Sequence, residues 1–451
     1  MTETETPSWG IEPVPERLRV LGVLDGFLLW ANLSVSLLVI VAGAFLVLPT
    51  SQFGLALSLP VAFASIVAAA LVGNVLLGLG GLIGADARVP TMVLMRAPLG
   101  RRGSYLPTAL NIVQCLGWSV FELIIIATGA SALSEHVFGF GGLAFWKVLF
   151  GLVATVLAFL GPVGFVRKYV RKFAVWFVIA SLLYLSWWSL HGQHPVGLWH
   201  RGGAHDFWPG FDFVLASIMS WTPLVADYTR FARTRRAGFW GAGVGYFVPT
   251  IPLFALGAVI AMSRHISDAP ALLTAIAAGG IASVLALLAL TVDESDEAFA
   301  NVYSGAVSLQ NLLPQIPQRA LVGGVAAIAT AGALLIDLRN YQTFLFLLGS
   351  FFVPLFAVLL ADWLLSGRHY DRADVFQAPE LRAEMVVAWL AGFGLYQWLY
   401  PQGPKWWTGL VAHTHPHALP WGGASLPSFV ASFALAAIAR VVARRFILAS
   451  A

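Results

Sequence analysis

Long apolar segments separated by short polar ones run through almost the whole chain. The hydrocarbon core of a bilayer is about 30 Å thick, so each helical crossing needs about 20 mainly apolar residues. Segments of this kind lie at 24–48, 54–79, 108–134, 146–166, 173–192, 212–231, 241–262, 281–313, 320–337, 341–365, 384–400 and 424–446. The pattern predicts an all-α integral membrane protein with about twelve transmembrane helices.

The composition favours lipid as the solvent of these segments. Hydrophobic residues make up 59% of the 451 residues and charged residues only 11%, whereas about 25% of the residues of soluble domains are charged. Cys115 is the only cysteine, which excludes disulfides and cysteine-based metal clusters. Residues 1–23 are polar, with no apolar core and no small-residue cleavage site, so we expect a cytoplasmic tail.

The basic residues predict an orientation, because Lys and Arg collect in the cytoplasmic loops of membrane proteins. With the N-terminus inside, 21 of the 26 basic residues fall on the cytoplasmic side. The five on the other side are Lys147, Arg201, Arg264, Arg339 and Lys405. We therefore expect an inner-membrane protein with both termini in the cytoplasm. The basic composition then requires no nucleic-acid partner.

Two of the predicted spans are interrupted near mid-depth. In the first span the segment WANLSVS places polar residues around Asn32, and in the sixth the segment SWTP brings Ser220, Trp221 and Pro223 together. Proline removes a backbone donor and weakens a helix. Because broken helices at matching places in two halves of a chain indicate a transporter binding site, we expect Asn32, Ser220 and Trp221 to contribute to one.

The two interruptions divide the chain into halves that match weakly. Asp25 precedes Asn32 by seven residues, and Asp212 precedes Ser220 by eight. Five spans per half would require the second half to be inverted across the membrane. The predicted organisation is a ten-helix transport core over 24–365, with repeat one at about 24–192 and repeat two at about 212–365, followed by two peripheral helices within 384–446.

The eighth predicted span carries four carboxylates in the segment DESDE. If that segment were a loop, most later basic residues would move outside, so the charge rule places it inside one long helix. At 100° per residue, one stripe of this helix is polar. It consists of Asp293, Asp296, Glu297, Ala300, Asn301, Ser304 and Ser308. Acidic groups at mid-membrane are costly and indicate a functional site by default.

Two chemistries fit this stripe. Carboxylate and hydroxyl oxygens are the ligands that a hard cation such as Na⁺ prefers. Alternatively, burial and like-charge crowding favour the protonated form of a carboxyl group, which would make it a proton carrier. The sequence does not choose between Na⁺ and H⁺.

The third predicted span places Gln114, Trp118 and Glu122 on one face at spacings of four residues. An indole can stack on a flat ring while an amide and a carboxylate bind its edge, as is typical of small-molecule pockets. The alternative is that Trp118 is ordinary packing and that the two polar groups satisfy other helices. No basic residue lies near the middle of the predicted spans to pair with Glu122.

Four segments together resemble the nucleobase:cation symporter-1 family, which includes cytosine, purine, allantoin, uracil and hydantoin permeases. They are GIEPVPERLRVLGVLDGFLLWANLSVS, NIVQCLGW, VADYTRFAR and TVDESDEAFANVYSGAVSLQN. The resemblance implies a five-plus-five inverted repeat of the amino-acid-transporter type with two peripheral helices. It also implies alternating access, in which a helix bundle rocks against a scaffold.

The resemblance also implies a substrate site in which aromatic side chains of spans three and six sandwich a flat ring. Trp118 resembles the stacking residue of span three, and Glu122 resembles its polar neighbour. Ile218 stands where span six often supplies its aromatic residue, so Trp221 is the expected substitute. The polar contacts from spans six and eight correspond to Ser220 and Asn301.

In this family the cation, where one is used, is held by backbone carbonyls and two hydroxyl side chains. The corresponding carbonyls are those of Leu28, Ala31 and Val292, and the side-chain positions are Ser295 and Asp296. The second hydroxyl position is thus a carboxylate here, which strengthens a cation or proton role.

The expected function is secondary active uptake of a nucleobase or a related heterocycle, coupled to Na⁺ or H⁺. Cytosine is favoured because Glu122 can accept hydrogen bonds from an amino-substituted ring. Hydroxymethylpyrimidine and allantoin are alternatives within the family, and an intramembrane carboxylate metal enzyme, a channel or a receptor are alternatives of another class. We expect no enzymatic activity and no cofactor other than a bound Na⁺. The histidines of the segment HTHPH, at 413–417, are either a metal site or a solvated loop.

Overall fold

The computed structural model describes residues 11–160, 165–199, 203, 206–313, 315–415, 417, 419 and 421–450. The longer helices are α1 (Val23–Ser34), α2 (Leu37–Val47), α3 (Leu59–Ala87), α6 (Tyr105–Phe138), α7 (Leu143–Leu160), α8 (Phe165–Leu190), α10 (Phe207–Met219), α12 (Arg235–Ser263), α14 (Ile281–Leu312), α15 (Gln318–Leu335), α16 (Tyr341–Leu365), α18 (Ala383–Leu399) and α20 (Ser425–Ser450).

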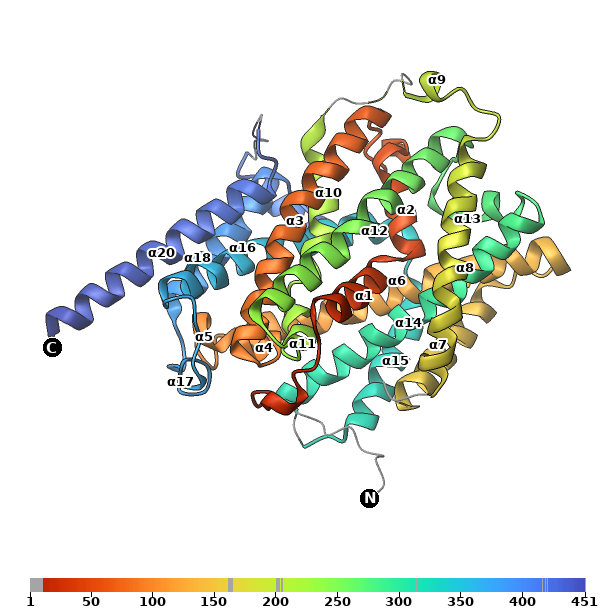
Figure 1. Ribbon diagram of the computed structural model, residues 1–451. Helices are drawn as coiled ribbons and strands as arrows, with labels where there is room; N and C mark the ends of the chain where they lie inside the picture. The colour runs from red at the N-terminus through yellow and green to blue at the C-terminus, as the bar shows by residue number, and fades with distance from the viewer. Residues whose placement is uncertain are drawn as a thin grey trace.

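Shorter helices lie in the connections between these elements (Figure 1). They are α4 (Thr91–Leu94), α5 (Arg96–Leu99), α9 (Pro195–Trp199), α11 (Val225–Thr229), α13 (Ala269–Ala277), α17 (Arg372–Phe376) and α19 (Lys405–Ala412), with 3-10 turns η1 (Glu16–Leu18), η2 (Thr50–Gln52) and η3 (Leu338–Asn340).

Every predicted span coincides with a helix or with a pair of helices. Five single helices are long and apolar enough to cross a membrane, and the bent pair of α1 and α2 is a sixth candidate. Several of the other predicted spans appear as shorter apolar helices. The structure thus confirms the all-helical class, while the count of twelve spans stays a prediction.

The predicted interruption of the first span is confirmed. Helix α1 ends at Ser34 and α2 begins at Leu37, and the two axes differ by 56°. Val35 and Ser36 between them have extended backbone, and the Ser36 hydroxyl caps α2 by accepting a hydrogen bond from the Leu38 amide at 3.0 Å. A serine that caps a helix satisfies one of the amides that have no partner within the helix, which explains why the chain can leave the helical path here.

The interruption of the sixth span is confirmed as well. Helix α10 ends at Met219, and α11 begins only at Val225. Pro223 lies in this gap and has no amide proton to continue a helix. The Thr222 hydroxyl donates to the Met219 carbonyl oxygen at 2.6 Å, and the Ala226 amide donates to the Thr91 hydroxyl at 2.9 Å. Side-chain groups thus bind backbone groups on both sides of the break.

Helix α12 packs along α3 and along both halves of the broken first span, α1 and α2. Figure 1 shows α1, α2, α3, α10 and α12 side by side. Gly81 and Gly238 permit the close approach of α3 and α12, since a Cβ on Gly81 would lie 2.5 Å from the Gly238 carbonyl oxygen. Small residues at helix crossings are typical of membrane proteins, where close backbone packing replaces the hydrophobic effect.

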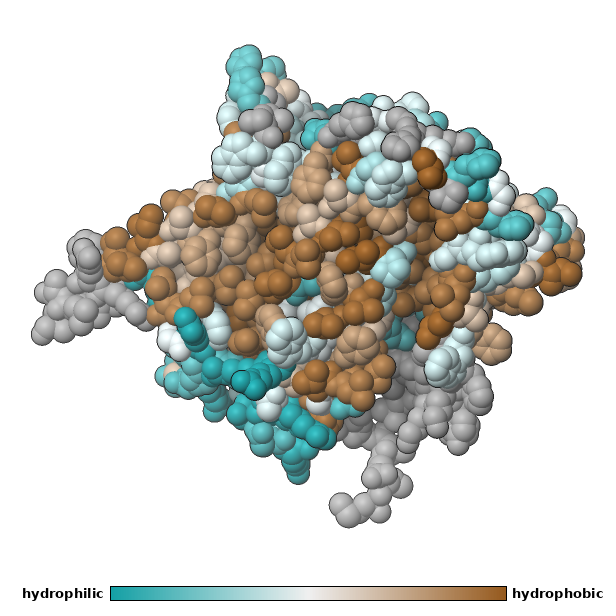
Figure 2. Space-filling view, turned by 45° about the horizontal axis from the view of Figure 1, so that its top comes forward, coloured by the Kyte–Doolittle hydropathy of each residue, from teal (hydrophilic) through white to brown (hydrophobic). Residues whose placement is uncertain are grey.

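Polar and apolar surfaces are separated on the molecule. In Figure 2 brown hydrophobic residues cover the middle of the visible face, and teal hydrophilic residues gather at its lower edge. Loops predicted to be cytoplasmic contact one another: Arg19 donates to the Ala232 carbonyl oxygen at 2.9 Å, and Arg102 pairs with Glu380 at 3.1 Å. These basic loops therefore share one end of the molecule, as the charge rule predicts.

The two aspartates used to match the halves have different roles. The Asp25 carboxylate accepts a hydrogen bond from the Gly22 amide at 2.8 Å, at the start of its own helix. Asp212 is buried and accepts from the Ala424 amide at 2.7 Å and the Ser425 amide at 3.1 Å, at the start of α20. Asp212 thus anchors the last helix, and this sequence match does not support the repeat.

Candidate substrate and coupling site

A buried cavity lies where the two broken segments meet α6, α12, α14 and α16. Its outline encloses about 300 Å³. The residues that line it are Leu33, Ser36, Leu38, Val39, Trp118, Glu122, Ser217, Trp221, Tyr246, Glu297, Asn301 and Tyr341. This space is narrow, and it has room for little more than one water molecule. A flat ring can enter only if aromatic side chains move apart.

Aromatic rings from four helices or helix breaks face this cavity. Trp118 of α6 packs edge-on against Tyr341, with ring centroids 5.9 Å apart, and Trp221 packs against Tyr246 at 5.9 Å. Ile218 is fully buried and points toward Gly73 of α3 instead. The expectation that Trp221 replaces Ile218 as the aromatic residue of the sixth span is therefore supported by its position.

Three glutamates meet beside the cavity and form what we call the carboxylate triad. Glu122 of α6 and Glu294 and Glu297 of α14 are at most 5% exposed, and one carboxylate oxygen of each lies within 4.8 Å of the others. Within the described part of the chain this is the one grouping of His, Cys, Asp and Glu with a spacing that suits a metal ion.

Glu294 connects the triad to the break in the first span. Its carboxylate accepts from the Ser36 hydroxyl at 2.7 Å, from the Leu37 amide at 2.6 Å and from the Leu38 amide at 3.4 Å. These donors belong to the N-terminal end of α2, where backbone amides and the helix dipole attract an anion. A change in the charge of the triad would therefore act directly on the start of α2.

Two members of the triad, Glu122 and Glu294, lack charge compensation among the described residues. The described structure pairs neither Glu122 nor Glu294 with a basic side chain. Like charges this close cannot all ionise in a buried site unless protons or a cation balance them. The site is therefore suited to hold a proton or a positively charged ligand.

Three predicted substrate residues lie outside the cavity lining. Gln114 is buried, and its amide donates to the Ser220 carbonyl oxygen at 2.7 Å. The Ser220 hydroxyl donates to the Ser217 carbonyl oxygen at 2.6 Å. Asn32 is partly exposed, near the end of α1. Gln114 thus fixes the break after α10, which matches the alternative interpretation that it satisfies another helix.

The predicted cation ligands are not brought together by side-chain packing. Leu28 and Val292 point outward, with 58% and 55% exposure, so that only their carbonyl groups remain candidates. Helix α1, which carries Leu28 and Ala31, packs mainly on α12, while α14 packs mainly on α6 and α8. Asp293 is half-buried. The side chains of Ser295 and Asp296 lie outside the described residues, so this cation site stays a prediction.

Comparison with known proteins identifies the family. The profile of a family described as permeases for cytosine/purines, uracil, thiamine and allantoin matches residues 13–379. This chain belongs to that permease family. It is therefore a multi-pass membrane transporter and not an enzyme, which overturns the alternative of an intramembrane metal enzyme.

The names of permeases with similar sequences refer to different heterocyclic substrates. The chain is 25% identical to the cytosine permease of Escherichia coli over 351 residues, which cover 73% of this chain and 78% of that protein. It is also 25% identical to the hydantoin permease of Microbacterium maritypicum over 299 residues, covering 61% and 60%. The allantoin permease of Bacillus subtilis is 25% identical over 339 residues, covering 67% and 68%.

Solved structures confirm the fold of this permease. The inward-facing conformation of Mhp1 matches with a TM-score of 0.74 at 18% identity, covering 99% of this chain and 94% of that one. Mhp1 in a closed conformation with bromovinylhydantoin bound, described as a nucleobase-cation-symport-1 family transporter, matches with a TM-score of 0.69 at 17% identity, covering 99% and 96%.

Sequence reasoning missed three important residues of this permease site. Tyr246 and Tyr341 line the cavity but belong to apolar segments that carry no polar pattern. Glu294 could have been found: at 100° per residue, Glu294, Glu297, Asn301 and two serines fall within about 80°. The predicted stripe was centred too close to Asp296, which excluded Glu294.

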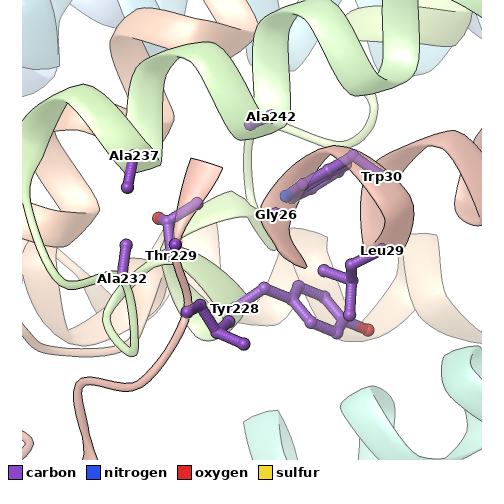
Figure 3. Close-up of a pocket in the computed structure, with 10 residues that line it drawn as sticks. Gly26, Leu29, Trp30, Tyr228, Thr229, Ala232, Ala237 and Ala242 are labelled. Carbon is purple, nitrogen blue, oxygen red and sulfur yellow. The ribbon is translucent and has the colours of Figure 1, made fainter. Parts of the chain in front are cut away.

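A second cavity of about 230 Å³ lies between α1, α11 and α12 (Figure 3). Trp30 and Tyr228 line it, and their rings pack edge-on with centroids 5.7 Å apart. Trp30 also contacts Trp221 at 5.8 Å. Since Trp221 lines the first cavity, the edge-on contact between Trp30 and Trp221 lies between the two cavities in this permease.

The histidines of the segment HTHPH lie on an exposed loop. His413, His415 and His417 are all exposed and follow α19. In the described parts of the chain they do not form a metal-ligand group, and they are remote in the fold from the permease site on α6 and α14.

Proposed function

We propose that this permease imports a nucleobase or a related heterocycle by secondary active transport, with cytosine the favoured substrate. The observation that carries the proposal is the cavity between the two broken segments, where Trp118 and Trp221 provide aromatic surfaces and Glu122 and Asn301 provide hydrogen-bonding groups. Flat heterocycles combine an apolar face with a polar edge, and this lining offers partners for both.

The proposed architecture is twelve spans, of which α1 to α16 form an inverted five-plus-five core while α18 and α20 are peripheral. Broken helices at both sides of one cavity support this arrangement. The protein would lie in the inner membrane with both termini in the cytoplasm, since the basic loops share one end of the molecule.

Alternating access would act through the breaks. Ser36 lines the cavity and also caps α2. Binding of a substrate in the cavity would therefore change the position of α2. Trp221 contacts Trp30, and this contact lies between the substrate cavity and the second cavity. Movement of these two indoles would open a path between the cavities.

The coupling ion is Na⁺ or H⁺, and each has its own candidate site. The carboxylate triad is suited to protons because its charges are uncompensated by the basic side chains that the structure describes around Glu122 and Glu294. The carbonyls of Leu28, Ala31 and Val292 with Ser295 and Asp296 are the candidate Na⁺ ligands. Asp293 and Glu297 lie on the same helix, and either ion would alter their electrostatic environment.

The names of similar permeases support this substrate class. A cytosine permease, a hydantoin permease and an allantoin permease all match at 25% identity. Glu122 favours cytosine among these rings, because its carboxylate can accept hydrogen bonds from an amino group. Hydantoin, allantoin and hydroxymethylpyrimidine are the alternatives.

Uptake into proteoliposomes tests the proposal. Labelled cytosine, adenine, uracil, hydantoin, allantoin and hydroxymethylpyrimidine would be offered with a Na⁺ gradient or a pH gradient imposed separately. We expect saturable accumulation of cytosine under one of the gradients, and Glu135→Gln at the exposed end of α6 serves as a control that retains it. Absence of accumulation of every ring under both gradients would contradict the proposal.

A further inference from the structure

A stripe of buried polar side chains follows α6 from its start to the carboxylate triad. It consists of Ser104, Thr108, Asn111, Gln114 and Glu122, all of which are buried. At 100° per residue these positions lie within about 120° of one another, so they share one face of the helix. Polar groups in a row along a membrane helix are costly unless they face protein or water.

Helix α14 carries a matching polar stripe. Glu297, Asn301, Ser304 and Ser308 lie within about 60° of one another, and each is at most 7% exposed. The opposite side of the helix is apolar and belongs to a hydrophobic cluster with residues of α15. Since α14 packs mainly on α6, its polar stripe faces that helix. We call the two facing stripes the polar seam.

Hydrogen bonds connect the seam across the two helices. The Asn111 amide donates to the Ser308 hydroxyl at 3.2 Å, and the Gln114 amide donates to the Asn111 side-chain oxygen at 3.4 Å. At the start of α6 the Ser104 hydroxyl donates to the carbonyl oxygen of Arg101, which lies on an exposed loop. The seam thus runs from the triad toward the end of the molecule that carries the basic loops.

Several buried polar atoms along this line have no protein partner. The Gln114 Oε1 oxygen has no hydrogen-bond partner among the described residues, and neither do Glu122 Oε2 and the Tyr341 hydroxyl, which both lie at the cavity. Buried polar groups are ordinarily satisfied by protein or by water. A bound water needs two to four polar partners, and the hydroxyls of the seam keep lone pairs for it. These atoms are therefore suited to bind a chain of water molecules.

We propose that the coupling ion of this permease is H⁺ and that the polar seam conducts it between the carboxylate triad and the cytoplasm. The inference rests on the proposed transport of a heterocycle and identifies the ion and its route. Between the triad and Ser104 the seam consists of neutral amides and hydroxyls. Such groups relay a proton through water but do not balance the charge of a metal ion.

The seam is separate from the proposed path of the substrate. That path passes through the second cavity, between α1, α11 and α12, whereas the seam lies between α6 and α14. Gln114 connects the two, because its amide also donates to the Ser220 carbonyl oxygen at the break of the sixth span. A movement of this break would therefore shift a group of the proton path.

The proton balance of one cycle follows from these positions. One O–H bond of a triad carboxyl group breaks, and a water molecule of the seam accepts the proton. Each water or hydroxyl then receives one proton and passes on another, so that one proton reaches the cytoplasm and the seam stays neutral. The carboxylate takes up a new proton when the cavity opens outward. Besides the triad, the titratable groups among the cavity-lining residues are the phenols of Tyr246 and Tyr341.

Proteoliposomes with a pH-sensitive dye in the lumen test the identity of the ion. The membrane potential is clamped with K⁺ and valinomycin, and labelled cytosine is added. We expect an inward pH gradient to drive accumulation in Na⁺-free buffer, and cytosine entry to acidify the lumen. A Na⁺ gradient at equal pH should drive no accumulation.

An apolar substitution in the seam tests the route. Asn111→Leu has a similar volume but removes the link between Gln114 and Ser308, so accumulation driven by the pH gradient should fall at least about tenfold. Cytosine exchange at equal pH on both sides needs no net release of a proton and should be unchanged. Asn111→Ser keeps a polar group and should retain accumulation. The control Ser181→Ala removes a buried α8 hydroxyl that donates to the Phe177 carbonyl oxygen, and it should behave as wild type.

The outcomes separate this inference from the transport function. If wild-type protein needs Na⁺ and does not acidify the lumen, the assignment of H⁺ is overturned and the permease function stands. If Asn111→Leu retains accumulation, or loses exchange as strongly as accumulation, the proton route through the seam is overturned. If wild-type protein neither exchanges nor accumulates any ring, the proposed function itself fails.

Discussion

The permease buries acidic side chains in two regions that differ in how the charges are compensated. At the end of the molecule that carries the basic loops, Asp362 of α16 is fully surrounded by partners. It pairs with Arg382 at 2.9 Å and with Arg440 at 3.3 Å, and it accepts a hydrogen bond from the Tyr370 hydroxyl at 2.7 Å. This cluster joins α16 to α18 and α20.

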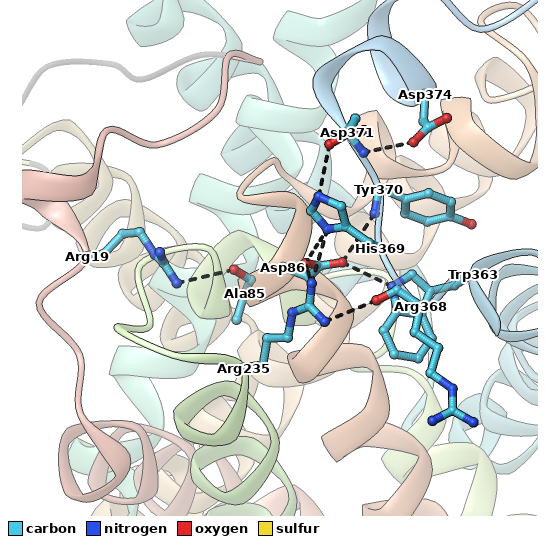
Figure 4. Close-up of polar contacts among 10 residues, drawn as sticks. All are labelled: Arg19, Ala85, Asp86, Arg235, Trp363, Arg368, His369, Tyr370, Asp371 and Asp374. Carbon is cyan, nitrogen blue, oxygen red and sulfur yellow. Dashed lines mark hydrogen bonds and ion pairs between the residues drawn. The ribbon is translucent and has the colours of Figure 1, made fainter. Parts of the chain in front are cut away.

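Asp86, at the end of α3, is compensated in the same way (Figure 4). Its carboxylate lies 2.5 Å from the Arg235 guanidinium and 2.8 Å from the His369 ring, and the Trp363 indole donates to it at 3.2 Å. The contacts tie α3, α12 and the segment after α16 together. Each oxygen of this buried carboxylate has a donor.

Glu122 and Glu294 of the carboxylate triad differ, because the described structure pairs neither with a basic side chain and Glu294 is held by a hydroxyl and two backbone amides. Paired buried charges such as Asp86 and Asp362 fix helices, and removal of one partner is expected to destabilise the fold. A buried acid without a basic partner, such as Glu122, destabilises the fold. Such acids are typical of sites where a proton or a positively charged ligand neutralises them. On the proposed function, this difference would distinguish acids that stabilise the fold from acids that take part in transport.

The largest predicted effect is on stability and concerns Asp362. Asp362→Ala would remove the nearer carboxylate partner of Arg382, which is almost fully buried and whose other carboxylate partner, Glu384, lies at 3.5 Å. We expect a loss of about 3–5 kcal/mol in the free energy of unfolding. Thermal unfolding in detergent, followed by size-exclusion chromatography, measures it. The control Glu135→Ala removes an exposed carboxylate near the end of α6 and should leave the midpoint almost unchanged. An equal midpoint for Asp362→Ala would refute the structural role.

Neutralisation of a triad member should not destabilise the protein, in contrast to the loss of Asp362. Glu122→Gln removes an ionisable group from a crowded, buried site, so the unfolding midpoint should be unchanged or raised. Accumulation of cytosine should fall by at least about tenfold, because the amide can neither carry a proton nor bind two donors. A lowered midpoint with retained accumulation would show that Glu122 belongs with the structural acids.

Trp118→Ala tests the aromatic surface of the cavity. Stacking of a base on an aromatic side chain contributes about 1–3 kcal/mol in alanine substitutions, so the dissociation constant for cytosine should rise by about one to two orders of magnitude. Trp118→Phe keeps an aromatic face and should have a smaller effect. Unchanged affinity in the alanine variant would remove Trp118 from the substrate site.

Ser36→Ala should have a smaller effect, on the link between the triad and α2. The variant removes a helix cap and the hydrogen bond to Glu294, and the loss of a cap costs about 1 kcal/mol. Hydrogen exchange at the first amides of α2 should increase. Ser186→Ala, in which an exposed hydroxyl bonded only within its own helix is removed, provides the control.

The smallest effect is expected at the surface. The pKa of Glu16 is lowered chiefly by its hydrogen bond with Arg19. A lowered pKa in the folded state stabilises the protein above the ordinary glutamate pKa, and this contribution is lost as the pH falls through the lowered value. The unfolding midpoint of Glu16→Gln should therefore be slightly lower than that of wild type at neutral pH. This difference should vanish in acid.

The sequence was sufficient to predict most of the fold. Apolar segments located each helix, and Pro223 and the serines near Asn32 located both breaks, because backbone geometry at these points depends on local chemistry. The basic residues predicted which loops share one end. The pairing of Asp212 with the start of α20 could not be predicted, since it joins residues more than two hundred positions apart.

The site was predicted less completely. Trp118, Glu122, Trp221 and Asn301, which were predicted to bind the substrate, line the cavity, and so does Glu297, which was predicted to bind the cation; their roles stay predictions. Gln114 does not line the cavity, and a helical wheel cannot tell a group that binds a ligand from one that binds a neighbouring helix. Tyr246 and Tyr341 were missed because a tyrosine in an apolar helix leaves no sequence pattern.

The most direct test of the functional assignment of the triad is cytosine accumulation by proteoliposomes that contain wild-type protein or Glu122→Gln, with Na⁺ and pH gradients imposed together. We predict that the wild type concentrates cytosine above equilibrium, while the folded variant only equilibrates it or fails to take it up. Equal accumulation by the two proteins would contradict the assignment of the uncompensated carboxylates to transport.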